Sequence, residues 1–94
     1  MDEVLKLLGL IYRAKKLLLG EEVLNQIEKV KIMFIASDTS EKNRIRYEKK
    51  CHYYQIKHID KYDSEQLSNA LGKNKIKLIG IIDKGFTELI QKKL

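Results

Sequence analysis

The sequence predicts an α/β protein in which about four strands alternate with five helices in a three-layer α/β/α sandwich. Two observations support this prediction. The continuous apolar run at 32–36 is typical of a strand covered on both faces, and 76–82 is a second long, mainly apolar strand segment. Segments with apolar residues at helical spacing lie around these runs. Because strands and helices alternate, we expect a largely parallel sheet whose functional loops lie at strand ends.

The N-terminal third of the chain predicts a helix, a short strand and a second helix. Apolar residues at helical spacing predict a helix over 3–14. A run of three leucines then predicts a strand over 17–19, which ends at Gly20. A second helix, about 21–29, begins with two acidic residues that complement the helix dipole.

The third predicted helix, about 40–54, has an apolar and a basic face. Tyr47, Cys51 and Tyr54 follow helical spacing, so we expect them to face the core. The basic residues on the opposite side are Lys42, Arg46, Lys49 and Lys50. This charge run is ordinarily explained as a solvated helix face, and the functional alternative is contact with an RNA backbone.

The C-terminal part of the chain completes the alternation. A short strand is predicted at 55–59, followed by a helix over 64–71 that ends at Gly72. The second long apolar strand, 76–82, is followed by a last helix at about 85–93. All of these elements fit one domain spanning 1–94, because a chain of 94 residues has no room for a second core.

Composition restricts the classes of protein and of partner. With 44% hydrophobic and 34% charged residues, we expect a soluble globular domain, with no membrane contact and a cytoplasmic location. The single cysteine, Cys51, excludes an internal disulfide and suits a reducing compartment. The net charge is +6, and residues 41–62 hold seven basic against three acidic side chains. This surplus is a modest indication of a polyanionic partner.

The sequence offers little for catalysis or metal binding. Cys51 and His52 are adjacent and, with His58, do not complete four ligands at a familiar spacing. The glycines form neither GxxxxGK[ST] nor GxGxxG, so no phosphate-binding loop of these types is expected. Asp38 at a strand end suggests a phosphoacceptor, but the better explanation is a cap on the following helix. We therefore expect no enzyme, no cofactor and no metal.

Six short blocks of the chain occur in an order that is seen in a known bacterial family. They are LGLIYRAKK (8–16), GEE (20–22), FIASD (34–38), CHYY (51–54), LSNALG (67–72) and IDKGF (82–86). Together they resemble the YlxQ-like branch of the kink-turn RNA-binding superfamily, the L-seven-Ae/L-thirty-e group of ribosomal proteins. The resemblance implies a compact α/β/α sandwich and recognition of kink-turn RNA, in which tandem sheared G·A pairs and a flipped-out base bend a duplex sharply.

The resemblance also implies where the RNA contacts lie. The residues that it places in contact with RNA come from three segments of the chain: Gly20, Glu21 and Glu22, then Ser40 and Arg44, then Lys61 and Tyr62. Sheared pairs leave guanine N–H groups exposed, and a carboxylate at position 21 or 22 would accept from them. The best-known members carry a glutamate and a lysine where simple counting from Gly20 gives Val23 and Gln26.

The expected partner is a structured RNA, with ribosomal RNA as one candidate, and the expected state is a monomer. Tyr53 and Tyr62 are candidates for stacking on unpaired bases. Two alternatives stay open. One is a small protein-interaction module that kept the fold without specific RNA recognition. The other is a non-specific RNA binder that uses only the 42–50 helix face.

Overall fold

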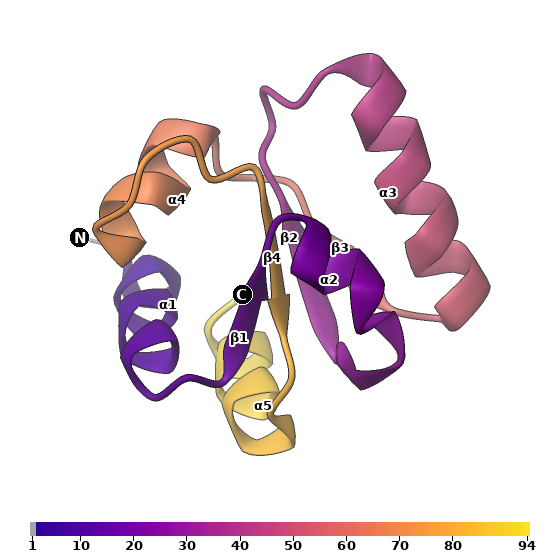
Figure 1. The fold of residues 1–94 in the computed structure, drawn as a ribbon. Coiled ribbons are helices and arrows are strands. Elements are labelled where there is room, and N and C mark those ends of the chain that lie inside the picture. Colours follow the sequence, from indigo (N-terminus) through magenta and orange to yellow (C-terminus); the bar gives the residue numbers. More distant parts are fainter. Residues whose placement is uncertain (1) are drawn as a thin grey trace.

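The computed structural model describes residues 2–94, which form five α-helices, one short 3₁₀ helix and a four-stranded sheet. In chain order the elements are α1 (Glu3–Arg13), β1 (Leu17–Leu19), α2 (Glu21–Asn25), the 3₁₀ helix η1 (Ile27–Lys29), β2 (Ile32–Ile35), α3 (Glu41–Tyr54), β3 (Lys57–Ile59), α4 (Ser64–Leu71), β4 (Leu78–Ile81) and α5 (Lys84–Lys93). Helices lie on both sides of the sheet (Figure 1). The predicted α/β fold class is therefore confirmed. No helix within residues 2–94 has the length and apolar character needed to cross a membrane.

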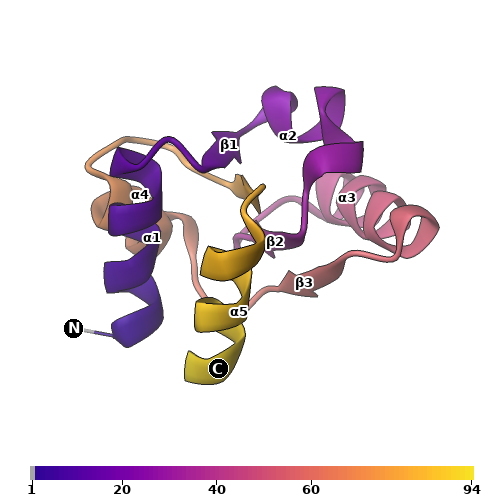
Figure 2. The same ribbon diagram turned by 90° about the horizontal axis from the view of Figure 1, so that it is seen from below.

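Two separate apolar clusters form the core, one on each face of the sheet. Helices α1, α4 and α5 lie on one side of the sheet, and α2 and α3 lie on the other (Figure 2). Successive residues of β2 alternate between these clusters, with Ile32 and Phe34 in the first and Met33 and Ile35 in the second. All four are fully buried. This burial on both faces explains why the strand has no polar residue.

The strand order is β1-β4-β2-β3, and only the β2–β3 pair is parallel. β4 runs antiparallel to both β1 and β2, so the predicted largely parallel sheet is wrong. The reason lies in α4, which begins and ends at the same end of the sheet. The carbonyl of Tyr62, just before α4, accepts from Ser37 N at 2.8 Å, and the carbonyl of Lys77, just after it, accepts from Ala36 N at 2.9 Å. α4 thus returns the chain to where it started, and β4 enters in the opposite direction.

The segment predicted as one helix over 21–29 is two elements. α2 ends at Asn25. The next residue, Gln26, has a φ of −118° that leaves the α-helical region, and η1 then continues with tighter bonds. Val23, fully buried, packs over β4 at Gly80, where an added Cβ would lie 2.9 Å from a Val23 methyl carbon. Gly80 therefore lets α2 lie close to the sheet. This contact fixes the position of the residues that follow Gly20.

Helix α3 differs from its prediction in its last turn. Tyr47 and Cys51 are buried as expected, but Tyr54 keeps 39% of its surface exposed, so its predicted core position is wrong. Gln55 adopts a left-handed conformation with φ of 56° and ends the helix. The chain then turns back, and Ile56 fills the core position with 8% exposure.

Candidate nucleic-acid interface

All three segments that the sequence associates with RNA meet at one end of the sheet. β1 leads into Gly20 at this end, and Gly20 N donates to Leu78 O of β4 at 3.1 Å. The loop after β2 bonds to the loop after β3 through Ser37 N and Tyr62 O. Strands β1 and β2 both run antiparallel to β4, so their C-terminal ends flank its N-terminal end. The fold therefore brings the three segments together, and we call this end the loop edge of the sheet.

Gly20 forms the turn that starts α2. Its φ of 57° and ψ of −134° lie in a region that is open almost only to glycine. An added Cβ would have no atom within 4 Å, so the space in front of this residue is open. The backbone at Gly20 is thus accessible to a large ligand, and the sharp turn needs glycine.

Two carboxylates follow this turn, and each has a defined neighbour. Arg46 of α3 donates to both oxygens of Glu21, at 3.2 and 3.3 Å. Gln26 Nε2 donates to Glu22 Oε2 at 2.7 Å. A carboxylate has about four acceptor positions, so Glu22 keeps capacity for donors from a ligand. Both glutamates are exposed, and Glu22 is held in place by a neutral amide rather than by a cation.

The two departures from the family pattern have different structural meanings. Val23 is fully buried against the sheet, so in this structure position 23 points into the core and not toward a ligand. The exposed carboxylates on α2 are therefore those of Glu21 and Glu22. Gln26 supports Glu22 through its hydrogen bond and places no positive charge beside it. The sequence alone did not reveal either role.

Arg44 connects the segments of the loop edge. Its Nη2 donates to the carbonyls of Ala36 at 3.2 Å and Ser37 at 3.0 Å, and its Nη1 bonds to Asp60 at 3.2 Å. A further ion pair at 3.6 Å joins Nη1 to Glu48. The guanidinium thus ties the loop after β2 to the loop after β3. These contacts give Arg44 a positioning role, and the direct contact with RNA that the resemblance implies stays a prediction.

Ser40 lies at the N-terminus of α3, where its hydroxyl accepts from Asn43 N at 3.3 Å. Ser40 therefore caps α3, and the predicted capping role of Asp38 is wrong. The Asp38 carboxylate instead accepts from the backbone N and the hydroxyl of Ser64, at 2.9 and 2.7 Å. These bonds from Ser64 lower the pKa of Asp38 and join the loop after β2 to the start of α4.

Lys61 and Tyr62 follow β3 at the same edge but differ in exposure. Lys61 is exposed, and its Nζ lies 5.4 Å from the centre of the Tyr62 ring. Tyr62 is only 3% exposed, and its hydroxyl donates to Asp2 Oδ2 at 3.0 Å. A buried ring cannot stack on a base, so the stacking role expected of Tyr62 is wrong in this conformation. Lys61 remains available to a phosphate.

The buried Tyr62 hydroxyl makes stability sensitive to alkaline pH. Burial, with the hydrogen bond to Asp2 and its negative charge, raises the Tyr62 pKa from 10.0 to about 12. Above pH 10 the unfolded chain loses this proton while the folded protein keeps it, so stability falls until the folded pKa is passed. We expect the free energy of unfolding to fall by up to about 1.4 kcal/mol per pH unit in this interval from this group.

Urea denaturation at about pH 9 and about pH 11 tests this expectation, with Tyr62→Phe as the control. The variant lacks the titrating hydroxyl but keeps the ring, so its stability should fall less over the same interval. Equal pH dependence in the two proteins would contradict the assignment.

Comparison with known proteins identifies the family. No protein-family model matches the chain. A curated relative, the RNA-binding protein YlxQ of Enterococcus faecium, is 34% identical over 90 residues, which cover 93% of this chain and 86% of the relative. The chain belongs to the YlxQ family. A second YlxQ RNA-binding protein, from Bacillus subtilis strain 168, is 29% identical over 83 residues, covering 85% of this chain and 83% of that protein. The resemblance read from six sequence blocks is therefore confirmed.

Solved structures extend this comparison. A protein of unknown function from Bacillus halodurans matches with a TM-score of 0.90 and 33% identity, covering 98% of this chain and 96% of that one. A 15.5kD RNA-binding protein of Giardia lamblia matches with a TM-score of 0.78, covering 96% of this chain and 80% of that one. At 15% identity this second match shows a shared fold only.

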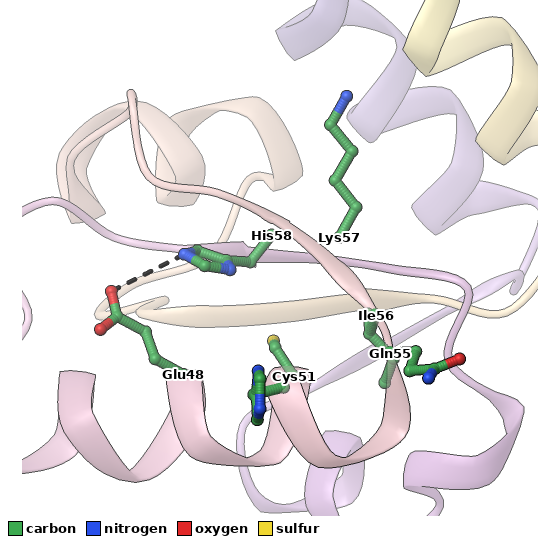
Figure 3. Close-up of a pocket in the computed structure, with 7 residues that line it drawn as sticks. Glu48, Cys51, Gln55, Ile56, Lys57 and His58 are labelled. Carbon is green, nitrogen blue, oxygen red and sulfur yellow. Dashed lines mark ion pairs between the residues drawn. The ribbon is translucent and has the colours of Figure 1, made fainter.

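On this YlxQ-family fold, a hollow of about 500 Å³ lies between the C-terminal half of α3 and β3 (Figure 3). His58 points toward Glu48, with 3.7 Å between Nε2 and Oε2, and Asp60 lies nearby. Sequence spacing did not group these three residues, because they come from different elements. Arg44 already pairs with both carboxylates, so a metal ion here would have to compete with a guanidinium.

The sequence offered Cys51, with His52 and His58, as a candidate metal ligand. In the structure, Cys51 does not belong to the polar cluster of this hollow. Its thiol lies 3.3 Å from Met33 Sδ in the core beneath α3. Burial, with a smaller effect of the Glu48 charge, raises the Cys51 pKa to about 11. A thiol with this pKa stays protonated near neutral pH, so it is a poor metal ligand and a poor nucleophile.

Proposed function

We propose that this protein binds structured RNA without catalysing a reaction, and that it recognises a kink-turn through the loop edge of the sheet. The observation that carries this proposal is the turn at Gly20. It opens onto free space and is followed by an exposed carboxylate, Glu22, whose only described polar contact is the amide of Gln26. The RNA-binding function in the names of both YlxQ relatives supports an RNA partner.

The chemistry of a kink-turn fits this turn. Sheared G·A pairs expose guanine N–H donors, and a carboxylate accepts hydrogen bonds from these donors. The carbonyl oxygens on the edge of a uracil would instead repel a carboxylate, so the carboxylate favours guanine. Gly20 would let the backbone enter the widened groove, because it carries no side chain into the open space. Exposed lysines at the same edge, Lys61 and Lys77, would then neutralise phosphates and position the RNA. Ribosomal RNA is one candidate for the natural target, and a monomer in the cytoplasm is the state we propose.

Glu22→Ala is expected to reduce the preference for kink-turn RNA over a straight duplex by about tenfold, which is the usual effect of removing one good hydrogen-bonding partner of a base. The reason is that Glu22 would read guanine N–H groups, whereas the phosphate contacts of the lysines are independent of sequence. Lys49→Ala, on the outer face of α3, should leave affinity for a kink-turn without single-stranded ends nearly unchanged. An unchanged preference in Glu22→Ala would show that the base contacts lie elsewhere.

The proposed function is tested by titrating the protein against a kink-turn RNA and a straight duplex of equal length, at about 50 mM and about 200 mM salt. We expect tighter binding to the kink-turn, with affinity falling at the higher salt concentration. Equal affinity for both RNAs would contradict kink-turn recognition and leave a non-specific RNA binder. Absence of binding to either RNA would favour a protein-interaction module.

A further inference from the structure

A basic and aromatic stripe runs along the outer face of α3 and adjoins the loop edge through Arg46, which pairs with Glu21. Lys42, Arg46, Lys49 and Tyr53 follow one another at helical spacing and are all exposed. From first to last they extend over about 16 Å of helix. Lys50 and Tyr54 lie beside them, and together these six residues are the α3 stripe. The stripe thus combines four positive charges with two aromatic rings.

The aromatic end of the stripe is unusually open. Tyr53 has 78% of its surface exposed, and Tyr54 has 39%. The two rings meet edge to face at 4.9 Å between centroids, so each restricts the movement of the other. With Lys49 and Lys50 they line a shallow hollow of about 450 Å³. A flat π face beside two ammonium groups is the arrangement that proteins use to bind an unpaired nucleotide.

The charges of the stripe have few partners within the protein. Lys42, Lys49 and Lys50 form no ion pair within residues 2–94. The acidic Glu48 of the same helix faces Arg44 and His58 instead. Positive charge therefore accumulates on the outer face of α3, where the acidic neighbours are Glu21, which pairs with Arg46, and Glu41 in the first turn of the helix.

We propose that the α3 stripe is a second RNA contact, which binds an unpaired RNA segment flanking the structured element held at the loop edge. A base stacks on Tyr53, and Lys49 and Lys50 bind the adjoining phosphates. Arg46 pairs with Glu21 at the start of α2, so the stripe is continuous with the proposed kink-turn contact. This proposal rests on the proposed function and extends it to a longer target: structured RNA with a single-stranded extension.

The proposal is tested with a kink-turn RNA that either ends in a blunt duplex or continues into an unpaired extension of about eight nucleotides at its 5′ or 3′ end. We expect one extension to improve affinity about tenfold, consistent with one stacked base and its phosphate contacts. Tyr53→Ala should abolish this gain, and Tyr53→Phe should keep it, because phenylalanine retains the stacking face. Both variants should bind the blunt RNA like the unaltered protein.

A charge-matched pair of double variants separates specific contacts from net charge. Lys49→Ala with Lys50→Ala should abolish the gain and lower the salt dependence, by about 0.7 in slope for each phosphate that is no longer neutralised. Lys6→Ala with Lys92→Ala, on α1 and α5, removes the same charge from the other side of the sheet and should keep the gain.

The outcomes distinguish this proposal from the proposed function. If blunt kink-turn RNA binds tightly and neither extension improves affinity, the α3 stripe is not an RNA contact, and a protein partner for this face becomes the better explanation. If the kink-turn is not preferred but a free single strand binds in a Tyr53-dependent manner, the stripe is confirmed and the kink-turn function is wrong. Loss of the gain in the Lys6 and Lys92 control would also overturn the proposal.

Discussion

Arg44→Ala is expected to lower the free energy of unfolding by about 2–4 kcal/mol and to weaken RNA binding as a consequence. The guanidinium donates to two backbone carbonyls after β2 and to Asp60 after β3. Its side chain is only 23% exposed, so water replaces these bonds incompletely. Removing it would also leave Asp60 and Glu48 facing each other without a cation. Urea denaturation measures the stability change, and titration with kink-turn RNA measures the affinity.

Arg44→Lys separates support of the loops from simple charge. Lysine keeps the positive charge but lacks the planar fork that reaches two carbonyls and a carboxylate together. We therefore expect most of the stability loss to remain. If Arg44→Lys is as stable as the unaltered protein but loses RNA affinity, Arg44 contacts RNA directly and its role is not positioning.

Gly20→Val is expected to reduce affinity for kink-turn RNA by at least about a hundredfold, or about 2.7 kcal/mol. The Gly20 backbone conformation strains any other residue by about 1–3 kcal/mol. The branched side chain would also occupy the open space in front of α2, where an RNA groove would approach. The added Cβ would meet no protein atom within 4 Å, so we expect the variant to fold with lower stability.

Gly72→Val is the matched control for this variant. Gly72 also has a positive φ, of 67°, and open space around its missing Cβ, but it ends α4. Both variants are therefore strained in the folded state, and only Gly20→Val places a side chain at the proposed RNA contact. Comparable losses of affinity in the two variants, after allowing for the unfolded fraction, would contradict the role of the Gly20 turn.

Local features of the fold could be predicted from the sequence because short-range chemistry determines them. The apolar runs around Ile32 and Ile79 correctly indicated strands that are buried on both faces. Gly72 ends α4 in the left-handed conformation that favours glycine. The direction of β4 was not predictable in this way. It depends on α4 returning to the same end of the sheet, and helical periodicity does not reveal where a helix lies.

The candidate site could be outlined from the sequence, but the contacts of its residues could not. The family resemblance associated the Gly20 turn with segments 40–44 and 61–62, and the fold places these segments at one edge of the sheet. The buried Tyr62 donates its hydroxyl hydrogen bond to Asp2, a residue sixty positions away in the chain. The hydrogen bond from Gln26 to the Glu22 carboxylate could not be predicted either, because it depends on Gln26 being the residue that follows the end of α2. Such long-range pairings and helix ends arise from tertiary packing, which no local pattern encodes.

The central position of β4 has a consequence for how the chain is made. β4 is the last strand to be synthesised, yet it lies between β1 and β2 and hydrogen-bonds to both. While translation is in progress, β1 therefore has no neighbouring strand, and the turn at Gly20 has no Leu78 carbonyl to bond. The sheet closes only after β4, which ends at Ile81 of the 94 residues, has left the ribosomal exit tunnel. A nascent or truncated chain that lacks β4 would consequently have no assembled loop edge with which to capture RNA.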